Sequence, residues 1–343
     1  MIDSNTKILV TGAAGFIGSW ICKRLVKDGY SEIYCIDDLS GTLGSIENIQ
    51  DLIDEKNIEF IKLDLASEYT KDTIKEIKPE IIYHLAANAR ESGSFFQPYE
   101  TVRRNYWAYI NTLEPAIKTG QLSKMILFSS MAVYGNQSPP FEETIPRKPV
   151  DIYGINKSAM EESTELLADI HNFDYTIIRP HNVYGKYQSL KDKYRNVFGI
   201  WMNSIMRKEP VNIYGDGNQI RGFSYIQNSL DCYINAMNDN CNGEVINLGG
   251  KEPTTINDAS KLVLKYMGVD QNYPINHLPD RYREVKVAYC TCGKSEKLLG
   301  YKEDISLEKG ISNMSKWALE QGKQEWTTEK LAIWNSRAPE NWK

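Results

Sequence analysis

Seven short runs rich in β-branched residues constrain what this 343-residue chain can fold into. The runs span residues 7–12, 32–37, 58–64, 81–86, 124–130, 175–180 and 244–250. Helical patterns separate several of them, at residues 16–28, 98–119 and 154–171. Strands that alternate with helices form a mostly parallel sheet with helices on both faces. The sequence therefore predicts an α/β fold with a doubly wound parallel sheet.

The pattern changes after about residue 180, where loops lengthen and the alternation of strands and helices fades. We expect two lobes. The first comprises residues 1–182, and the run at 244–250 returns to its sheet. The second and smaller lobe comprises residues 183–243 and 251–343. Because the chain crosses between them more than once, the lobes are predicted to be interwoven.

The charge and hydrophobicity of the chain argue against several classes of partner. Forty basic and forty-five acidic side chains give a formal charge of -5. Such a chain has no general electrostatic attraction to nucleic acid or anionic membranes. No run approaches the ~20 apolar residues of a membrane span, and "MIDSNTKILV" leaves no room for a signal peptide. We expect a cytoplasmic protein that binds neither nucleic acid nor membranes.

The cysteines and histidines do not predict a metal site. Of the six cysteines, only Cys290 and Cys292 are close in sequence, and a single C-x-C is poor zinc spacing. The four histidines form no cluster in the sequence. We therefore expect reduced thiols, as in cytosolic proteins, and no bound metal.

A glycine turn follows the first predicted strand and precedes the first predicted helix. In Gly12-x-x-Gly15-x-x-Gly18, the first glycine allows a tight turn and the second lets backbone N–H groups approach a pyrophosphate. The third lets helix and strand pack closely. A P-loop is disfavoured because no Gly-Lys-Ser/Thr follows. Asp37 ends the next strand, about twenty residues later, where it could bind a ribose hydroxyl. No Arg or Lys follows in "DDLSGT", which favours NAD over NADP.

A tyrosine and a lysine four residues apart begin the helix predicted at 154–171. This spacing places Tyr153 and Lys157 on one helix face. A phenol titrates near ~10, and a nearby ammonium together with a positive nicotinamide ring would lower that pKa. Tyr153 could then remove a hydroxyl proton, while Ser130, at the end of a strand, bridges phenolate and substrate. Such a pair also arises by chance on helix surfaces. The order of glycine loop, acid, serine and Tyr-x-x-x-Lys favours the catalytic interpretation.

At this point the chain resembles a known family. The resemblance rests on "TGAAGFIGS", "IDDLS", "LDL", "HLAA", "SSMAVYG", "YGINK", "RPHNVYG" and "GDGNQIRGFSYI". The chain is similar to the extended short-chain dehydrogenase/reductase superfamily, in its NAD-dependent nucleotide-sugar epimerase/dehydratase branch, and within that branch to UDP-sugar 4-epimerases. The resemblance covers nearly the whole chain. It implies a Rossmann-type sheet with a smaller, interwoven substrate-binding lobe, NAD as cofactor and a nucleotide diphosphate sugar as substrate.

The resemblance also implies roles for individual residues. The catalytic residues would be Ser130, Tyr153 and Lys157. The residues expected at the cofactor are Gly12, Gly15, Phe16, Ile17, Gly18, Asp37, Asp38, Asp64, Leu65, Leu85, Ala86, Ala87, Asn105, Tyr153 and Lys157. Among these, Asp37 and Asp38 would hold the adenosine ribose and Asn105 would lie near the nicotinamide. The residues expected at the substrate are Ser130, Asn182, Arg221 and Arg281.

Some substrate residues are ambiguous, and the chain departs from the usual family pattern. Arg283 is close enough in sequence to replace Arg281 in this role. Gly222 and Asn228 stand where the family often has aspartates, and "NYWAY" replaces a common Asn-Val-x-Gly-Thr. These departures indicate a less-studied branch. The resemblance further implies a homodimer formed through the helices at 98–119 and 154–171.

The residues after Ser130 reduce the number of reaction types that the site could catalyse. Dehydratases of the family carry acids directly after the catalytic Ser or Thr, whereas Met131 and Ala132 cannot transfer protons. A 4-epimerase, which oxidises C4 and returns the hydride to the other face, needs no such acid. We therefore expect a nucleotide-sugar 4-epimerase. The alternatives are a nucleotide-sugar 4-dehydrogenase or keto-reductase, a 4,6-dehydratase or C5-epimerase, and a non-catalytic NAD-binding protein. The sequence leaves the nucleotide base and the sugar open.

Overall fold

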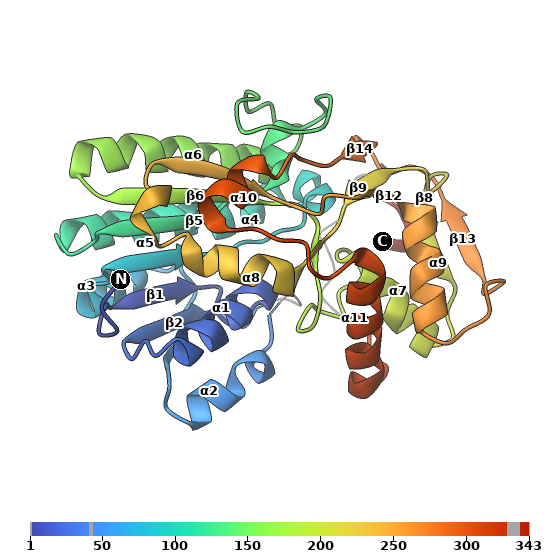
Figure 1. Ribbon diagram of the computed structural model, residues 1–343, viewed down its shortest axis with the longest axis horizontal. Helices are drawn as coiled ribbons and strands as arrows, with labels where there is room; N and C mark the ends of the chain where they lie inside the picture. Colours follow the sequence, from blue (N-terminus) through green and yellow to red (C-terminus); the bar gives the residue numbers. More distant parts are fainter. Residues whose placement is uncertain (1, 41–43, 328–336, 343) are drawn as a thin grey trace.

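A seven-stranded parallel sheet forms the centre of the computed structural model, which describes residues 2–40, 44–327 and 337–342 (Figure 1). Its strands are β1 (Ile8–Thr11), β2 (Ile33–Asp37), β3 (Glu59–Lys62), β4 (Ile81–His84), β5 (Lys124–Phe128), β6 (Asp174–Pro180) and β11 (Glu244–Leu248). They lie in the order β11-β6-β5-β4-β1-β2-β3. All seven predicted strands are confirmed. The order reverses between β1 and β4, and ligands of such sheets bind beyond the carboxyl ends of the strands at this point.

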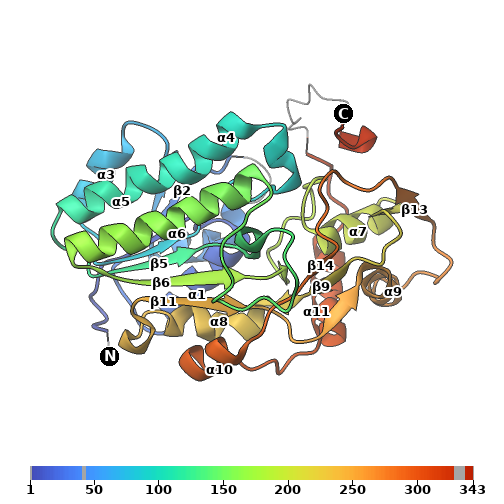
Figure 2. The ribbon, with the colours of Figure 1, turned by 90° about the horizontal axis from the view of Figure 1, so that it is seen from above.

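Helices cover both faces of the sheet. One face carries α3 (Thr70–Ile77), α4 (Pro98–Val102), α5 (Ala108–Lys118) and α6 (Ile152–His171), while the other carries α1 (Phe16–Lys27), α8 (Ile226–Asn235) and α10 (Gly293–Leu299) (Figure 2). Ile8 and Val10 of β1 belong to the hydrophobic core with α1 and α8. Leu9 belongs to the other core, with residues of α5 and α6. Strands buried on both faces are apolar throughout, which explains the continuous hydrophobic runs in the sequence.

The helix predicted over residues 98–119 is interrupted. Arg103–Trp107 forms a π-helical segment between α4 and α5, and such segments insert a wider turn into an α-helix. The segment contains Asn105, which is fully buried. Its side chain accepts a hydrogen bond from the Asn88 N–H (2.7 Å) and donates one to the Asn88 carbonyl (3.3 Å). The segment therefore fixes the loop that follows β4.

The second lobe combines helices with small sheets. Its helices are α7 (Val197–Met206), α9 (Ile256–Tyr266) and α11 (Leu307–Gln321). Its paired strands are β8 (Val211–Tyr214) with β13 (Ile275–Leu278), β7 (Val183–Tyr184) with β10 (Ser224–Tyr225), and β9 (Ile220–Gly222) between β12 (Pro253–Thr255) and β14 (Val287–Ala288). The division of lobes at 182/183 and 250/251 stays a prediction. The short α2 (Gln50–Asp54) follows β2 in the first lobe.

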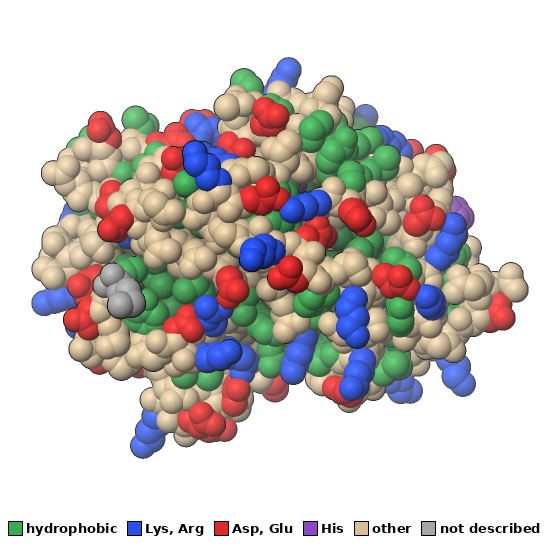
Figure 3. Space-filling model, viewed as in Figure 1, with side chains coloured by type: hydrophobic (Ala, Val, Ile, Leu, Met, Phe, Trp, Pro, Cys, Tyr) green, Lys and Arg blue, Asp and Glu red, His purple; other side chains and the backbone are tan. Residues whose placement is uncertain are grey.

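The surface carries charges of both signs. Acidic and basic side chains are intermixed on the face shown in Figure 3. Among the described residues, no helix combines the length and the apolar character needed to cross a membrane. In the same part of the chain, no group of three or more His, Cys, Asp or Glu side chains is arranged to hold a metal ion.

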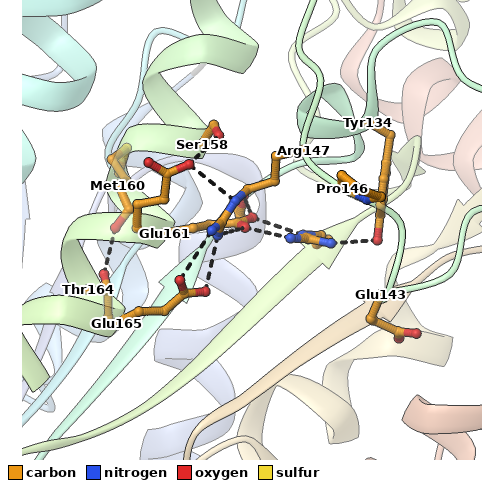
Figure 4. A network of polar contacts seen from close by, with 12 residues as sticks. Tyr134, Glu143, Pro146, Arg147, Ser158, Met160, Glu161, Thr164 and Glu165 are labelled. Atoms are coloured by element: carbon orange, nitrogen blue, oxygen red, sulfur yellow. Dashed lines mark hydrogen bonds and ion pairs between the residues drawn. The ribbon is translucent and has the colours of Figure 1, made fainter. Parts of the chain in front are cut away.

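A buried ionic network fixes α6 against the ends of β5 and β6 (Figure 4). Glu161 of α6 is fully buried. It accepts hydrogen bonds from Arg179 Nε (3.0 Å) and Nη2 (2.6 Å), from Arg147 Nη1 (3.0 Å) and from the Ser129 hydroxyl. Arg179 also donates to the Tyr134 hydroxyl (2.7 Å). One carboxylate thus connects a helix, two strands and the loop before α6.

Replacing Glu161 by Gln is expected to destabilise the fold. The change leaves the buried Arg179 guanidinium without its counter-charge, and such losses typically cost about 3–5 kcal/mol. Glu162→Gln is the matched control, because Glu162 lies on the surface (side chain 58% exposed) and its pairing with Arg147 is long, at 3.4 Å. We expect the control to cost less than about 1 kcal/mol. Urea unfolding of the two variants checks the difference, and equal losses would contradict a central role for Glu161.

Candidate active site

A cleft of about 700 Å³ lies beyond the carboxyl ends of the strands and is lined by residues of both predicted lobes. It collects almost all the residues predicted at a cofactor or substrate: Gly12, Gly15, Phe16, Ile17, Gly18, Asp37, Asp38, Asp64, Leu65, Leu85, Ala86, Ala87, Ser130, Tyr153, Lys157, Asn182, Arg221 and Arg281. Asn105 does not line the cleft, because its amide is used to hold Asn88. It is therefore better described as a support for the loop that lines the cleft.

The glycine turn leaves room for a pyrophosphate at the start of α1. Gly12 has a φ of +70°, and a Cβ there would lie 2.8 Å from the backbone nitrogen of Ala86. A Cβ on Gly18 would collide with the carbonyl oxygen of Gly12. No acidic residue occupies the first turn of α1, so the positive end of the helix dipole is free to attract an anion. These residues fit a dinucleotide.

The acids after β2 are held by backbone N–H groups at the same end of the cleft. Asp37 accepts hydrogen bonds from the N–H groups of Ala14 (3.1 Å) and Leu39 (2.9 Å), and burial raises its pKa. Asp38 accepts one from the N–H of Ser40 (2.8 Å) and lies 3.5 Å from Arg104 Nη1. Arg104 was not predicted from the sequence, because the π-helical segment brings it there from a distant part of the chain.

Asp64 also lines the cleft. Its carboxylate accepts a hydrogen bond from the Ala66 N–H (2.9 Å) and pairs with Arg103. Arg104 also forms an ion pair with Glu100, with 3.1 Å between Nε and Oε2. Both arginines of the π-helical segment thus pair with carboxylates.

The three residues predicted to be catalytic meet where β5 ends and α6 begins. Ser130 follows β5, and its hydroxyl accepts a hydrogen bond from the Ala132 N–H (3.1 Å). Asp151 caps α6 by accepting a hydrogen bond from the Gly154 N–H (2.7 Å), which places Tyr153 and Lys157 in its first two turns. Lys157 Nζ donates to the Phe128 carbonyl (2.6 Å) and lies 5.8 Å from the centre of the Tyr153 ring.

Burial dominates the electrostatics of this group. It raises the pKa of Tyr153 to about 12, while the charge of Arg195 and a hydrogen bond with Ser130 act in the opposite direction. Burial, with the charge of Arg195, lowers the pKa of Lys157 to about 7. The expected lowering of the tyrosine pKa is thus not found in the protein alone. Arg195, which the sequence analysis missed, is the foremost cation that favours the phenolate.

The two predicted arginines of the second lobe share one carboxylate. Arg221 Nη2 lies 2.8 Å from Glu284 Oε1, and Arg281 binds Glu284 through Nε (2.7 Å) and Nη2 (2.9 Å). Glu284 is nearly buried, with 7% of its side chain exposed. It was not predicted, although its position three residues after Arg281 could have indicated it. Arg283 is exposed and instead donates to the Val150 carbonyl (3.4 Å).

Asn182 lies between the catalytic group and these arginines. Its side chain donates a hydrogen bond to the Gly222 carbonyl (3.3 Å), and its backbone has a φ of 41°. Asparagine tolerates this left-handed conformation better than most residues. The cleft therefore presents, in one continuous surface, a dinucleotide turn, a Ser–Tyr–Lys group and a pair of arginines.

Comparisons with known proteins agree with this geometry. The model of the NAD dependent epimerase/dehydratase family matches residues 8–249. The UDP-glucose 4-epimerase of Mycolicibacterium smegmatis is 27% identical over 307 residues, covering 89% of this chain and 96% of that protein. The crystal structure of the Thermotoga maritima UDP-glucose 4-epimerase with UDP-glucose is 30% identical, with a TM-score of 0.84, covering 92% and 99% of the two chains.

A further solved structure contains both cofactor and substrate. It is the UDP-glucuronic acid 4-epimerase of Bacillus cereus in complex with UDP-glucuronic acid and NAD. It is 31% identical to this chain, with a TM-score of 0.83, and the match covers 92% of this chain and all of that one. The glycine turn and the acids after β2 fit NAD as the cofactor. The chain belongs to the NAD dependent epimerase/dehydratase family, within the extended short-chain dehydrogenase/reductase superfamily.

Proposed function

We propose that the protein is a UDP-sugar 4-epimerase that acts through transient oxidation at C4 to a 4-keto sugar. The observation that carries this proposal is the composition of the cleft around Ser130. Tyr153 and Lys157 lie beside it, while Met131 and Ala132, which also line the cleft, offer no proton donor or acceptor in their side chains. The relatives named UDP-glucose and UDP-glucuronic acid 4-epimerases support UDP as the nucleotide.

Each residue of the group has a defined task in this reaction. NAD, held at the glycine turn and Asp37, would supply the hydride acceptor and donor for C4. Tyr153 takes the proton of the C4 hydroxyl as its phenolate and later gives it back. Because burial opposes the phenolate, Tyr153 depends on nearby positive charge, from Arg195 and from Lys157 in its ammonium form. The Ser130 hydroxyl lies beside the phenol and donates to the substrate oxygen as negative charge develops.

The substrate is anchored at the other end of the cleft. Arg221 and Arg281 present guanidinium groups whose planar donors match phosphate oxygens. Glu284 holds both side chains in place before the substrate arrives. A diphosphate fixed in this way leaves the sugar free to rotate and present either face of C4 to the cofactor, and the small Ala132 leaves space for that movement.

We expect the purified protein to equilibrate a C4-epimeric pair of UDP-sugars without net oxidation. UDP-glucose, UDP-glucuronate and UDP-N-acetylglucosamine would each be incubated with the protein in D2O and followed by proton NMR. The C4 epimer should form, with no deuterium at C5 and no accumulated NADH. Accumulation of NADH would instead show a net dehydrogenase, and exchange at C5 would show a dehydratase or C5-epimerase. Either result contradicts the proposal.

Tyr153→Phe is expected to lower kcat by about 10²- to 10⁴-fold, the usual contribution of a positioned acid–base group. The NAD content of the purified variant should not change, because the glycine turn and Asp37 are untouched. Tyr106→Phe is the matched control, since it removes a phenol that bonds to Ser163 (2.9 Å) outside the cleft. Steady-state rates and bound NAD are the measurements. A Tyr153→Phe variant with full activity would refute the assigned role.

We also propose that the protein forms a homodimer through the helical segment at 98–119, which comprises α4, the π-helical segment and α5, and through α6. These elements lie on the same face of the sheet (Figure 2). They expose large apolar side chains, among them Tyr99 (75% exposed), Leu166 (66%) and Ile170 (69%). Large apolar side chains exposed along these helices indicate an interaction surface. A second copy of the chain is the partner that covers it.

Substituting Leu166 and Ile170 together by Glu should convert the dimer to a monomer. Charges at these positions cannot be buried against a second copy without a large desolvation cost. Size-exclusion chromatography with light scattering measures the mass directly. A double substitution of Lys297 and Lys302 by Glu, on or beside α10, is the control and should leave the mass unchanged. A wild-type protein that is monomeric at micromolar concentration would contradict the proposal.

A further inference from the structure

Two loops that meet at the cleft are joined by a buried ion pair. Arg90, in the loop after β4, binds Asp192, in the loop before α7, through Nη2 (2.9 Å) and Nε (3.3 Å). Their side chains are 5% and 0% exposed. Asp192 also accepts hydrogen bonds from the N–H groups of Tyr194 (2.7 Å) and Arg195 (3.2 Å). This ion pair fixes the neighbouring residues Glu91 and Arg195, which both line the cleft.

Glu91 lines the cleft, within electrostatic range of both ends of the substrate site. Its negative charge acts on Tyr153 and Asp151 at the catalytic end, and on Arg221 and Arg281 at the end that would hold the diphosphate. In a UDP-sugar the hexose connects the diphosphate to the reacting carbon. The hexose would therefore cross the part of the cleft where Glu91 lies.

The carboxylate of Glu91 differs from the other acids of the cleft in having no partner among the described residues. Asp37, Asp38 and Glu284 each accept hydrogen bonds from backbone or side-chain groups. Neither oxygen of the Glu91 carboxylate receives a hydrogen bond or an ion pair from the part of the chain that the structure describes. Its fixed loop and its unpaired oxygens leave it available to a ligand.

We propose that Glu91 binds the sugar of the substrate, accepting hydrogen bonds from ring hydroxyls and disfavouring sugars that carry a carboxylate. An ionised carboxylate only accepts hydrogen bonds, and those it accepts from hydroxyls are charge-assisted. A second carboxylate nearby is repelled. The substrate class is thus a UDP-hexose without an acidic group, preferred to a UDP-hexuronate. This inference rests on the proposed UDP-sugar 4-epimerase function.

Arg195 is the cation that opposes this preference. Its charge acts on Tyr153 and Lys157, which places it at the catalytic end of the cleft. Its guanidinium forms no ion pair within the described ranges 2–40, 44–327 and 337–342. If Arg195 instead received a carboxylate of the sugar, the wild-type protein would prefer UDP-glucuronate. Binding of the sugar by Glu91 therefore predicts tighter binding of UDP-glucose, whereas binding by Arg195 predicts tighter binding of UDP-glucuronate.

The test compares UDP-glucose, UDP-glucuronate and UDP itself as ligands of the NAD-loaded protein. Isothermal titration calorimetry gives the Kd values, and NMR gives kcat/KM where turnover occurs. The variants are Glu91→Gln, which keeps the shape of the side chain without its charge, and Glu142→Gln, an exposed acid outside the cleft. We expect wild-type protein and the control to bind UDP-glucose at least tenfold more tightly than UDP-glucuronate. Glu91→Gln should reduce that ratio by about tenfold and change the Kd of UDP less than the Kd values of the two UDP-sugars.

Three outcomes would overturn the inference. A wild-type preference for UDP-glucuronate would assign the sugar site to Arg195. An unchanged ratio in Glu91→Gln would show that Glu91 does not contact the sugar. An equal gain in affinity for all three ligands would show that it acts through its charge on Arg221 and Arg281 instead. Because Kd values are measured without turnover, failure of the 4-epimerase proposal, seen as absence of C4 epimers with any UDP-sugar, is distinguishable from failure of this one.

Discussion

The buried carboxylate of Glu161 is the interaction on which the geometry of the catalytic group depends. It lies four residues after Lys157 and eight after Tyr153, on the same face of α6. Through Arg179 and Ser129 it ties that face to the ends of β6 and β5. Ser129 directly precedes Ser130, so the network sets the distance between the serine and the two helix residues. A buried ion pair contributes little net stability, but it specifies one position of α6 against the sheet.

Burial makes charge at the catalytic group costly, and this cost is part of the chemistry. The pKa of Tyr153 is raised to about 12 and that of Lys157 is lowered to about 7. Both shifts favour the neutral forms: the phenol stays neutral near pH 7, whereas the ammonium and amine forms of Lys157 are comparable there. Positive charge next to the phenol reverses this balance, as Arg195 already does in part. The phenolate is therefore coupled to the arrangement of cations around it, and a substrate that changes that arrangement also changes the reactivity of Tyr153.

The sequence predicted the sheet and the glycine turn well, because both depend on short local patterns. All seven strands, the start of α1 and the Ser–Tyr–Lys group follow from runs of neighbouring residues. It failed where function depends on contacts between distant segments. Arg104 reaches Asp38 only because of a π-helical segment, and Glu284 joins two arginines that lie sixty residues apart in the chain. Asn105 was assigned to the cofactor, whereas tertiary structure uses its amide to hold a loop.

Glu91 and Arg195 show the same limit at the point where substrate choice is made. Glu91 follows Arg90 of the Arg90–Asp192 ion pair in the sequence, and the N–H of Arg195 donates a hydrogen bond to Asp192. Neither residue follows from a local motif. In the proposed function, the rigid sheet and α6 would place the groups that reaction at C4 requires. The loops after β4 and before α7 would add the opposite charges that face the sugar. Reaction and substrate preference would then be set by separate parts of the structure, and changes in these two loops would alter the sugar accepted without disturbing Ser130, Tyr153 and Lys157.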